Sequence, residues 1–227
     1  MKSKGIIIGL LVFSIIFPLI AEAATTKTLD KETELHPQGW ISGSVRFKAG
    51  TAVTLNEQNE VMTGTLAYDE SFLTVGNAFI SVGESFRPAY FNRVEFMKGK
   101  PITFNESGEV LNGNLVSHTD IYLIKKKDRF ITFQQFTFIA FDNDGNLLQG
   151  TLAHNTLLRP IGWKNYLPLD DTAGFLKFKT ETEIFFGPGG QVIKGTIAQD
   201  FTTLSKITYR AGTTLQFSET EPPKIIN

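Results

Sequence analysis

The sequence contains no cysteine, which excludes disulfides and a lipid-modified cysteine at a mature N-terminus. Its net charge is only −1, so it lacks the concentrated basic surface that electrostatic nucleic-acid binding requires. It has no Gly-x-Ser-x-Gly elbow or comparable nucleophile signature, and no histidine pair has metal-ligand spacing. We therefore expect no enzyme activity, no cofactor, no metal site and no nucleic-acid partner.

Long apolar runs are also scarce, and the one present lies at the N-terminus. Lys2 and Lys4 precede an apolar stretch over residues 5–20, and Ala21-Glu22-Ala23 follows as a small-x-small cleavage site. This order is typical of a signal peptide over residues 1–23. The run falls short of the roughly twenty continuous apolar residues of a membrane span. We expect export to the periplasm, the cell surface or the medium, with no transmembrane segment after cleavage.

The rest of the chain is rich in residues that favour strands. It contains 20 phenylalanines among 227 residues, together with many Thr, Val and Ile, and turn residues recur between the apolar segments. Residues 24–38 are polar and aperiodic, which is typical of a linker, and residues 219–227 have the composition of a tail. The sequence predicts a single all-β domain over residues 39–218.

One pattern occurs four times, and each copy is centred on a glycine in a predicted strand. A Phe stands seventeen residues before each glycine, a Val or Ile eleven before, and a Leu or Ile two after. The copies are residues 47–66, 96–115, 133–152 and 178–197, centred on Gly64, Gly113, Gly150 and Gly195. Repetition of this kind predicts a repeat architecture before any local detail is considered.

Each copy has the pattern of an antiparallel hairpin. Two strand-like segments flank a four-residue turn whose last residue is Gly or Asn, the residues that best tolerate a left-handed conformation. The glycine shares its strand face with the aliphatic residues two before and two after it, although glycine weakens a strand interior. We predict that its missing side chain leaves room for the Phe seventeen positions earlier or for the residue nine positions earlier.

The two ends of the array have the pattern of half-copies. Residues 209–217 match an outgoing strand without a return strand, and residues 39–45 match a return strand without an outgoing one. Complementary halves are compatible with closure into a barrel or ring, in which the first strand completes the last repeat. They are also compatible with an open solenoid-like sheet whose ends are capped. Closure is slightly favoured at this point.

Two insertions break the repeat, at residues 77–93 and 159–174. Loops between repeats tend to gather on one face, and these two mix aromatic and cationic side chains in a way that suits contact with carbohydrate, peptide or an anionic polymer. The candidate ligand contacts are Arg87, Tyr90, Arg93, Trp163, Lys164 and Tyr166. The competing and favoured interpretation is that these aromatic residues only cover the sheet.

Two further features invite a functional reading. Residues 142–146 (Asp-Asn-Asp-Gly-Asn) superficially resemble a calcium loop, but Leu147 stands where an EF-hand needs Gly and Ala153 where it needs Glu, so a plain turn is expected. His118 and His154 occupy matching turns after their glycine strands, where we expect no metal or base role.

The Gly-x-hydrophobic-hydrophobic-x-Gly segments at residues 108–113, 145–150 and 190–195 are similar to the hairpin of MORN-type repeats. Over residues 40–217 the pattern also resembles uncharacterised exported β-repeat proteins of diderm Firmicutes. It departs from MORN repeats in lacking their regular period and their Tyr before the second Gly. Choline-binding repeats share a similar hairpin but carry Trp–Tyr cages, whereas Trp40 and Trp163 do not recur in the repeat. The resemblance implies a β-hairpin scaffold used for contacts.

These observations predict an exported, non-enzymatic scaffold or interaction module of the bacterial cell envelope, with an envelope polymer or another envelope protein as partner. The first alternative is a carbohydrate- or envelope-polymer-binding module that uses the aromatic insertions. An envelope hydrolase is the least favoured alternative.

Overall fold

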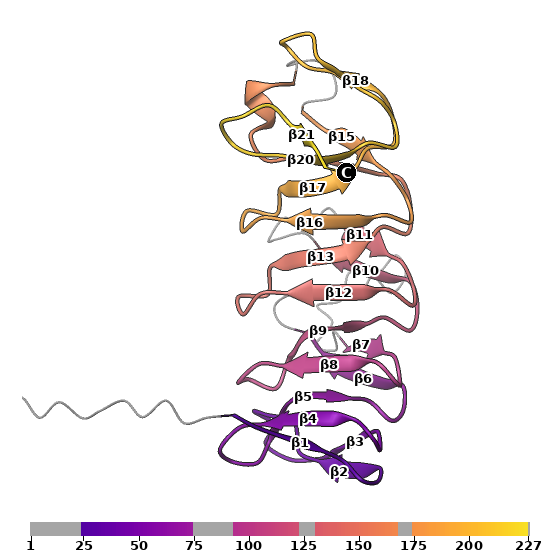
Figure 1. The fold of residues 1–227 in the computed structure, drawn as a ribbon, viewed down its shortest axis with the longest axis vertical. Helices are drawn as coiled ribbons and strands as arrows, with labels where there is room; N and C mark the ends of the chain where they lie inside the picture. The colour runs from indigo at the N-terminus through magenta and orange to yellow at the C-terminus, as the bar shows by residue number, and fades with distance from the viewer. Residues whose placement is uncertain (1–23, 75–92, 123–129, 168–173, 227) are drawn as a thin grey trace, which may run out of the picture.

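The computed structural model describes residues 24–74, 93–122, 130–167 and 174–226. Eleven strands form one antiparallel sheet, and Figure 1 shows them stacked like rungs along the long axis of an elongated molecule. In spatial order they are β1 (Thr25–Thr28), β4 (Ala52–Leu55), β5 (Val61–Thr65), β8 (Pro101–Phe104), β9 (Val110–Asn114), β12 (Phe138–Phe141), β13 (Leu147–Thr151), β16 (Glu183–Phe186), β17 (Val192–Thr196), β20 (Thr214–Gln216) and β21 (Lys224–Ile225).

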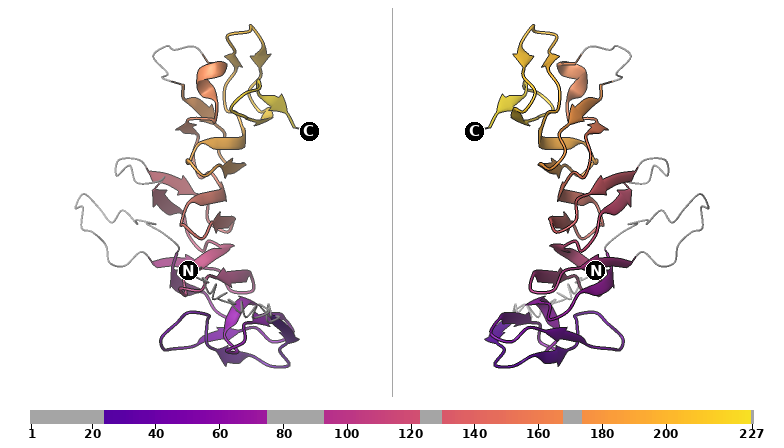
Figure 2. Two further views of the ribbon diagram at one scale, coloured as in Figure 1. Left: turned by 90° about the vertical axis from the view of Figure 1, so that its left-hand side faces the viewer. Right: turned by 90° about the vertical axis from the view of Figure 1, so that its right-hand side faces the viewer.

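A second layer of two-stranded antiparallel sheets lies behind the long sheet in the view of Figure 1, and Figure 2 shows the same array from its narrow sides. The pairs are β2 (Thr33–Leu35) with β3 (Val45–Phe47), β6 (Glu70–Leu73) with β7 (Arg93–Phe96), β10 (Thr119–Tyr122) with β11 (Phe130–Phe133), β14 (Thr156–Leu158) with β15 (Leu176–Phe178), and β18 (Phe201–Thr202) with β19 (Thr208–Tyr209). One short 3-10 helix, η1 (Trp163–Asn165), follows β14. The all-β prediction is confirmed.

The glycine of each hairpin provides space for a phenylalanine ring of the second layer. A Cβ built on Gly64 would lie 2.5 Å from Cδ1 of Phe47, and one built on Gly113 would lie 2.5 Å from Cδ1 of Phe96. The same overlap joins Gly150 to Phe133 and Gly195 to Phe178, and all four rings are at most 1% exposed. The predicted pairing is thus confirmed, and the partner is the Phe seventeen positions earlier. The core lies between the two layers.

A β-bulge in each hairpin changes the predicted strand faces. Between β4 and β5, Thr54 pairs with Thr63 but Leu55 pairs with Val61, so Met62 is the extra residue. Val61 is buried and Met62 is only partly buried. The prediction that Met62 flanks the glycine on the apolar face was wrong, because a strict alternation of faces cannot anticipate an inserted residue. The same register shift occurs in the hairpins β8–β9, β12–β13 and β16–β17.

The predicted hairpin turns are confirmed. Their last residues have positive φ, namely Asn59 at 61°, Gly108 at 78°, Gly145 at 80° and Gly190 at 70°. In three turns the opening side chain also accepts a backbone N–H four residues later, as Oδ1 of Asn56 does from Glu60 at 2.9 Å. The same oxygen of Asn105 and of Asp142 also accepts the N–H two residues later, which is the contact of an Asx turn.

The N-terminal end of the array differs from the prediction. Residues 24–38 are not a linker, because β1 pairs with β4 and β2 pairs with β3. Residues 39–45 are not a return strand either, since they form a turn and bends before β3 begins at Val45. The return strand is β1 itself: the buried Leu29 donates its N–H to the carbonyl of Thr51, as Leu66 does to Lys100.

The C-terminal end also contains a strand that the sequence did not indicate. β21 lies within residues 219–227, the expected tail, and pairs with β20. Tyr209 stands where the other copies have Phe, and its hydroxyl donates to the carbonyl of Pro223 at 2.5 Å. β1 and β21 occupy opposite edges of the sheet, so the array is open and the slightly favoured closure was wrong.

Candidate functional site

The candidate contact residues do not form one site among the described residues. Arg87 and Tyr90 lie outside the described residues. Arg93 begins β7, where its exposed guanidinium donates to the carbonyl of Ser71 at 2.7 and 3.2 Å. Trp163 and Lys164 belong to η1. The next strand of the long sheet is β8 after Arg93 and β16 after η1, and three strands of the sheet lie between β8 and β16. The two insertions are therefore attached at different levels of the array.

Tyr166 belongs to the core. It is 4% exposed, its hydroxyl donates to the carbonyl of Ile161 at 2.6 Å, and its ring stacks on Phe217 with centroids 6.2 Å apart. Burial raises the pKa of the Tyr166 phenol well above its ordinary value. This placement agrees with the interpretation that aromatic residues of the insertion cover the sheet.

Trp163 is half-buried, packs against the core and has two cationic side chains near its ring. The guanidinium carbon of Arg159 lies 4.9 Å from its ring centre, and Nζ of Lys164 lies 5.8 Å away, both within cation–π range. Gly174 packs so closely on the indole that a Cβ there would overlap it. These contacts fix Trp163 within its own loop, which leaves Lys164 as the exposed cation of this segment.

The two tryptophans lie in equivalent turns, a relation that the sequence analysis did not find. Pro37-Gln38-Gly39-Trp40 follows β2, and Pro160-Ile161-Gly162-Trp163 follows β14. The prolines form equivalent parallel bridges, to the first residues of β5 and β17, and both glycines have positive φ, 74° and 68°. We call each of these segments a Pro-x-Gly-Trp turn. The signal was present in the sequence, but it lay outside the glycine-centred repeat and was missed.

Each Pro-x-Gly-Trp turn holds the turn of the next hairpin along the sheet. Nε1–H of Trp40 donates to the carbonyl of Gly108 at 2.9 Å, and Gly39 packs against the carbonyl of Glu106. In the second turn, Nδ2 of Asn165 donates to the carbonyl of Glu219, and Gly162 packs against Ser218. A larger residue at either glycine would collide with that backbone. The geometry that the two turns share thus connects successive hairpins of the sheet.

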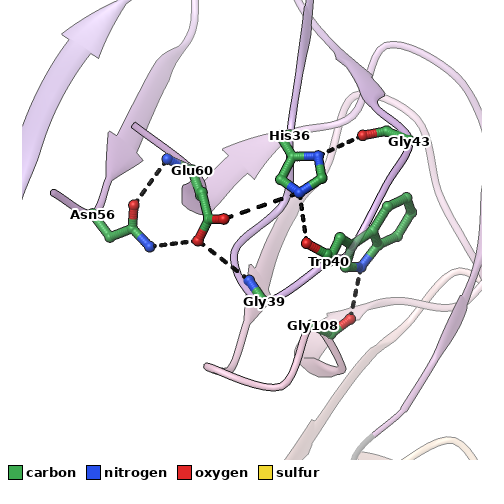
Figure 3. A network of polar contacts seen from close by, with 7 residues as sticks. All are labelled: His36, Gly39, Trp40, Gly43, Asn56, Glu60 and Gly108. Carbon is green, nitrogen blue, oxygen red and sulfur yellow. Dashed lines mark hydrogen bonds and ion pairs between the residues drawn. The ribbon is translucent and has the colours of Figure 1, made fainter. Parts of the chain in front are cut away.

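A polar network fixes the first Pro-x-Gly-Trp turn, as Figure 3 shows. Nδ1 of His36 lies 2.6 Å from the carbonyl oxygen of Gly43, and Nε2 lies 2.7 Å from that of Trp40. A carboxylate oxygen of Glu60 lies 4.0 Å from Nε2. The carbonyls of Trp40 and then Gly43 raise the pKa of His36, and Glu60 adds a smaller effect of the same sign. His36 was not predicted as a functional residue because it fell in the expected linker.

Glu60 is itself held by the hairpin turn and by the Pro-x-Gly-Trp turn. Nδ2 of Asn56 donates to its Oε2 at 2.8 Å, and the N–H of Gly39 lies 3.4 Å from the same oxygen. The next hairpin has the same pair without a histidine: Nδ2 of Asn105 donates to Oε2 of Glu109 at 3.1 Å. Asn105 and Glu109 therefore provide a natural comparison for the network around His36.

The other polar candidates have structural partners. Both carboxylate oxygens of Asp142 accept hydrogen bonds from within its own turn, from Asp144 and Asn146. Nδ1 of His118 accepts the N–H of Gln135 at 3.3 Å, and the rings of His118 and His154 are 6.4 Å apart. Within the described ranges, no group of three or more His, Asp or Glu side chains could hold a metal ion.

The described part of the chain has no helix of the length and apolarity needed to cross a membrane. Comparisons of the chain with protein-family models, with curated proteins and with solved structures each found no match.

Proposed function

We propose that the protein is an exported, non-enzymatic β-hairpin scaffold of the bacterial cell envelope that contacts an envelope polymer or another envelope protein. The observation that carries the proposal is the single open sheet of eleven strands, in which the recurring residues serve the packing of the chain itself. In this proposal the chain comprises four full copies of the repeat, and residues 25–29 and 209–226 form the half-copies at its ends.

The recurring polar residues support this assignment because they too have structural roles. After each of the return strands β5, β9, β13 and β17, a side chain accepts the N–H of the residue that lies two positions beyond the next Phe or Tyr of the pattern. Oδ1 of Asp69 accepts from Lys98 at 2.7 Å, and Oδ1 of Asn155 accepts from Thr180 at 2.8 Å. Asp200 and His118 hold Ala211 and Gln135 in the same way. Polar side chains that accept backbone N–H groups in this way fix turns, which is a structural role.

The first test is localisation and partner capture. The full chain is produced in a diderm bacterium, and its mass and cell fraction are determined. The proposal expects cleavage after Ala23, mature protein in the envelope fraction, and cross-linking there to a polymer or protein. Retention of the full-length chain in the cytoplasm would contradict export, and hydrolysis of envelope polymers by the purified protein would contradict the non-enzymatic assignment.

A second candidate function is a carbohydrate- or envelope-polymer-binding module, and the outer face of the sheet favours it. One row of directly paired residues crosses all eleven strands. It consists of Thr26, Thr54, Thr63, Thr103, Asn112, Ala140, Gln149, Phe185, Lys194, Gln216 and Lys224. From Thr26 to Phe185 the row is uncharged. At a strand spacing of about 4.8 Å this uncharged part of the row spans roughly 34 Å, a length that suits a segment of a linear neutral polymer.

This candidate is tested by cosedimentation with purified peptidoglycan and neutral glycans. Thr103→Lys and Asn112→Lys place charge in the centre of the row, and we expect each to reduce retention at least threefold. Ser71→Lys, on the second layer, is the matched control and should bind as the unmodified protein does. Equal retention of all three variants would exclude the outer face as the binding surface.

A further inference from the structure

The geometry points to His36 as a proton-operated lock, which fixes the first Pro-x-Gly-Trp turn on the β8–β9 turn while its imidazole is protonated. A neutral imidazole has one N–H and one lone pair, whereas an imidazolium donates from both nitrogens. Both ring nitrogens of His36 face carbonyl oxygens at hydrogen-bond distance, 2.6 and 2.7 Å. Only the protonated ring satisfies both contacts, since a lone pair directed at a carbonyl oxygen is repelled.

The two accepting carbonyls make the proton a structural element of the turn. They belong to Trp40 and Gly43, so the imidazole of His36 holds the segment from Trp40 to Gly43 next to the residue that follows β2. Trp40 in turn packs on Phe72 with ring centroids 6.0 Å apart and donates to Gly108. Loss of the proton breaks one of the two ring contacts, so the backbone of Trp40 or Gly43 is released and the indole follows.

The charges around the ring agree with this assignment. Glu60 faces His36 from the β4–β5 hairpin, with its carboxylate 4.0 Å from Nε2. On the second layer, Glu34 and Arg46 pair with each other at 2.6 Å. On the β8–β9 turn, Glu106 meets Gly39 through its backbone carbonyl. Glu60 is therefore the charged side chain in contact with the ring, and it favours the cation.

The second Pro-x-Gly-Trp turn has a permanent cation where the first has a titratable one. Arg159 precedes Pro160 as His36 precedes Pro37, and its guanidinium lies 4.9 Å from the Trp163 ring centre. Arginine stays charged at all accessible pH values, whereas histidine changes charge near neutrality. The two turns thus share a cation at one position, and only the first can be released by pH.

The direction of the pH dependence follows from the raised pKa. A histidine whose pKa is higher in the folded chain than in the unfolded chain stabilises the fold below the unfolded value of about 6.5. This contribution is lost as the pH rises through the folded pKa. The lock is therefore closed below the ordinary pKa of histidine and opens as the pH rises through the raised pKa of folded His36.

The test follows the Hε1 proton of His36 and the indole N–H of Trp40 by NMR between pH 5 and pH 9. We expect both signals to titrate with one midpoint, above about 6.5. His36→Gln should abolish the transition at Trp40, while His118→Gln should leave it unchanged. A His36 midpoint at or below the ordinary value, or a Trp40 transition that persists in His36→Gln, would overturn the lock.

The role of Glu60 gives a second, matched measurement. Glu60→Gln removes the charge that faces the ring, so the midpoint should fall. Glu109→Gln makes the same change in the hairpin that lacks a histidine. In this variant the titration midpoint of His36 should remain at the wild-type value. Trp163→Phe identifies the two indole signals and also allows the transition to be read from the fluorescence of Trp40 alone. Equal midpoints for Glu60→Gln and Glu109→Gln would contradict the assignment.

Discussion

At the scale of single residues, one strand position accepts or excludes a side chain according to what packs on it. Lys27 in β1 pairs with Val53 as Gly64 in β5 pairs with Ile102, so the two positions are equivalent. Gly64 lies under the ring of Phe47, whereas the side chain of Lys27 is exposed. The glycine is therefore a consequence of the aromatic ring in the second layer, not of the strand itself.

This difference predicts opposite outcomes for the same substitution. Gly150→Val places its side chain in the ring of Phe133, and overpacking of this kind typically lowers the free energy of unfolding by about 1–3 kcal/mol. Lys27→Val, at the equivalent exposed position, should change it by no more than about 0.5 kcal/mol. Chemical denaturation measures both. Similar losses of stability for the two variants would show that the ring contact is not the reason for the glycine.

At the scale of elements, the hairpin turns connect successive levels of the array. Gly108 ends the β8–β9 turn with positive φ and lies directly under the indole of Trp40. Gly50 has a similar φ of 72°, but no heavy atom of the described residues outside its chain neighbours lies within 4 Å of a Cβ built there. A comparison of substitutions at Gly50 and Gly108 therefore distinguishes the cost of backbone strain from the cost of a side-chain collision.

Gly50→Ala should cost only the left-handed strain of an L-residue, about 1–2 kcal/mol. Gly108→Ala adds the displacement of Trp40, so it should be more destabilising and should also shift the tryptophan fluorescence maximum. Thermal unfolding and emission spectra record the two effects. An unchanged spectrum in Gly108→Ala would mean that Trp40 does not depend on this turn.

The elements that could be predicted are those specified by residues close together in sequence. The hairpin turns and the pairing of glycine with the earlier Phe both follow from short, repeated spacings. β1 was missed because Lys27 replaces the glycine, which is needed only where a ring packs. β21 was missed because Pro222 and Pro223 precede a strand of only two residues. Each failure occurred where a tertiary contact, rather than a local pattern, decides the structure.

The candidate site was predicted less well than the fold. Tyr166 and Trp163 have the composition of a contact loop, yet Tyr166 packs on Phe217 of the array and Trp163 packs on Arg159 of its own loop. Sequence alone cannot separate these roles, because an aromatic ring with a polar group suits a ligand surface and a core margin equally well. The role of His36 depends on the positions of two backbone carbonyl groups, and these positions cannot be read from a pattern of side chains.

At the scale of the whole molecule, both edge strands of the long sheet have features that oppose pairing with another strand. β1 is exposed along its length and carries Lys27, while β21 has two residues preceded by Pro222-Pro223. Lysine, proline and short strands are devices that prevent edge-to-edge association. The open array is therefore expected to remain monomeric through its edges.

Deletion of residues 219–227 should remove this protection. It exposes the edge of β20 and leaves the hydroxyl of Tyr209 without the carbonyl of Pro223. We expect self-association that increases with concentration, measured by size-exclusion chromatography with light scattering. Deletion of residue 227 alone keeps β21 and the hydrogen bond from the N–H of Ile226 to the carbonyl of Thr214, and it is the control. A monomeric 219–227 deletion at all concentrations would show that β21 does not guard the edge.

The orientation of the strands has a mechanical consequence. The strands run across the long axis in Figure 1, so their backbone hydrogen bonds run along it, and β1 and β21 lie at opposite ends of the sheet. Tension applied between the two ends pulls parallel to these bonds and loads them one strand at a time. The array should therefore yield to stretching by sequential peeling from its ends, at lower force than a sheet loaded in shear. The array is therefore better suited to setting the distance between groups attached to its two ends than to resisting tension along its long axis.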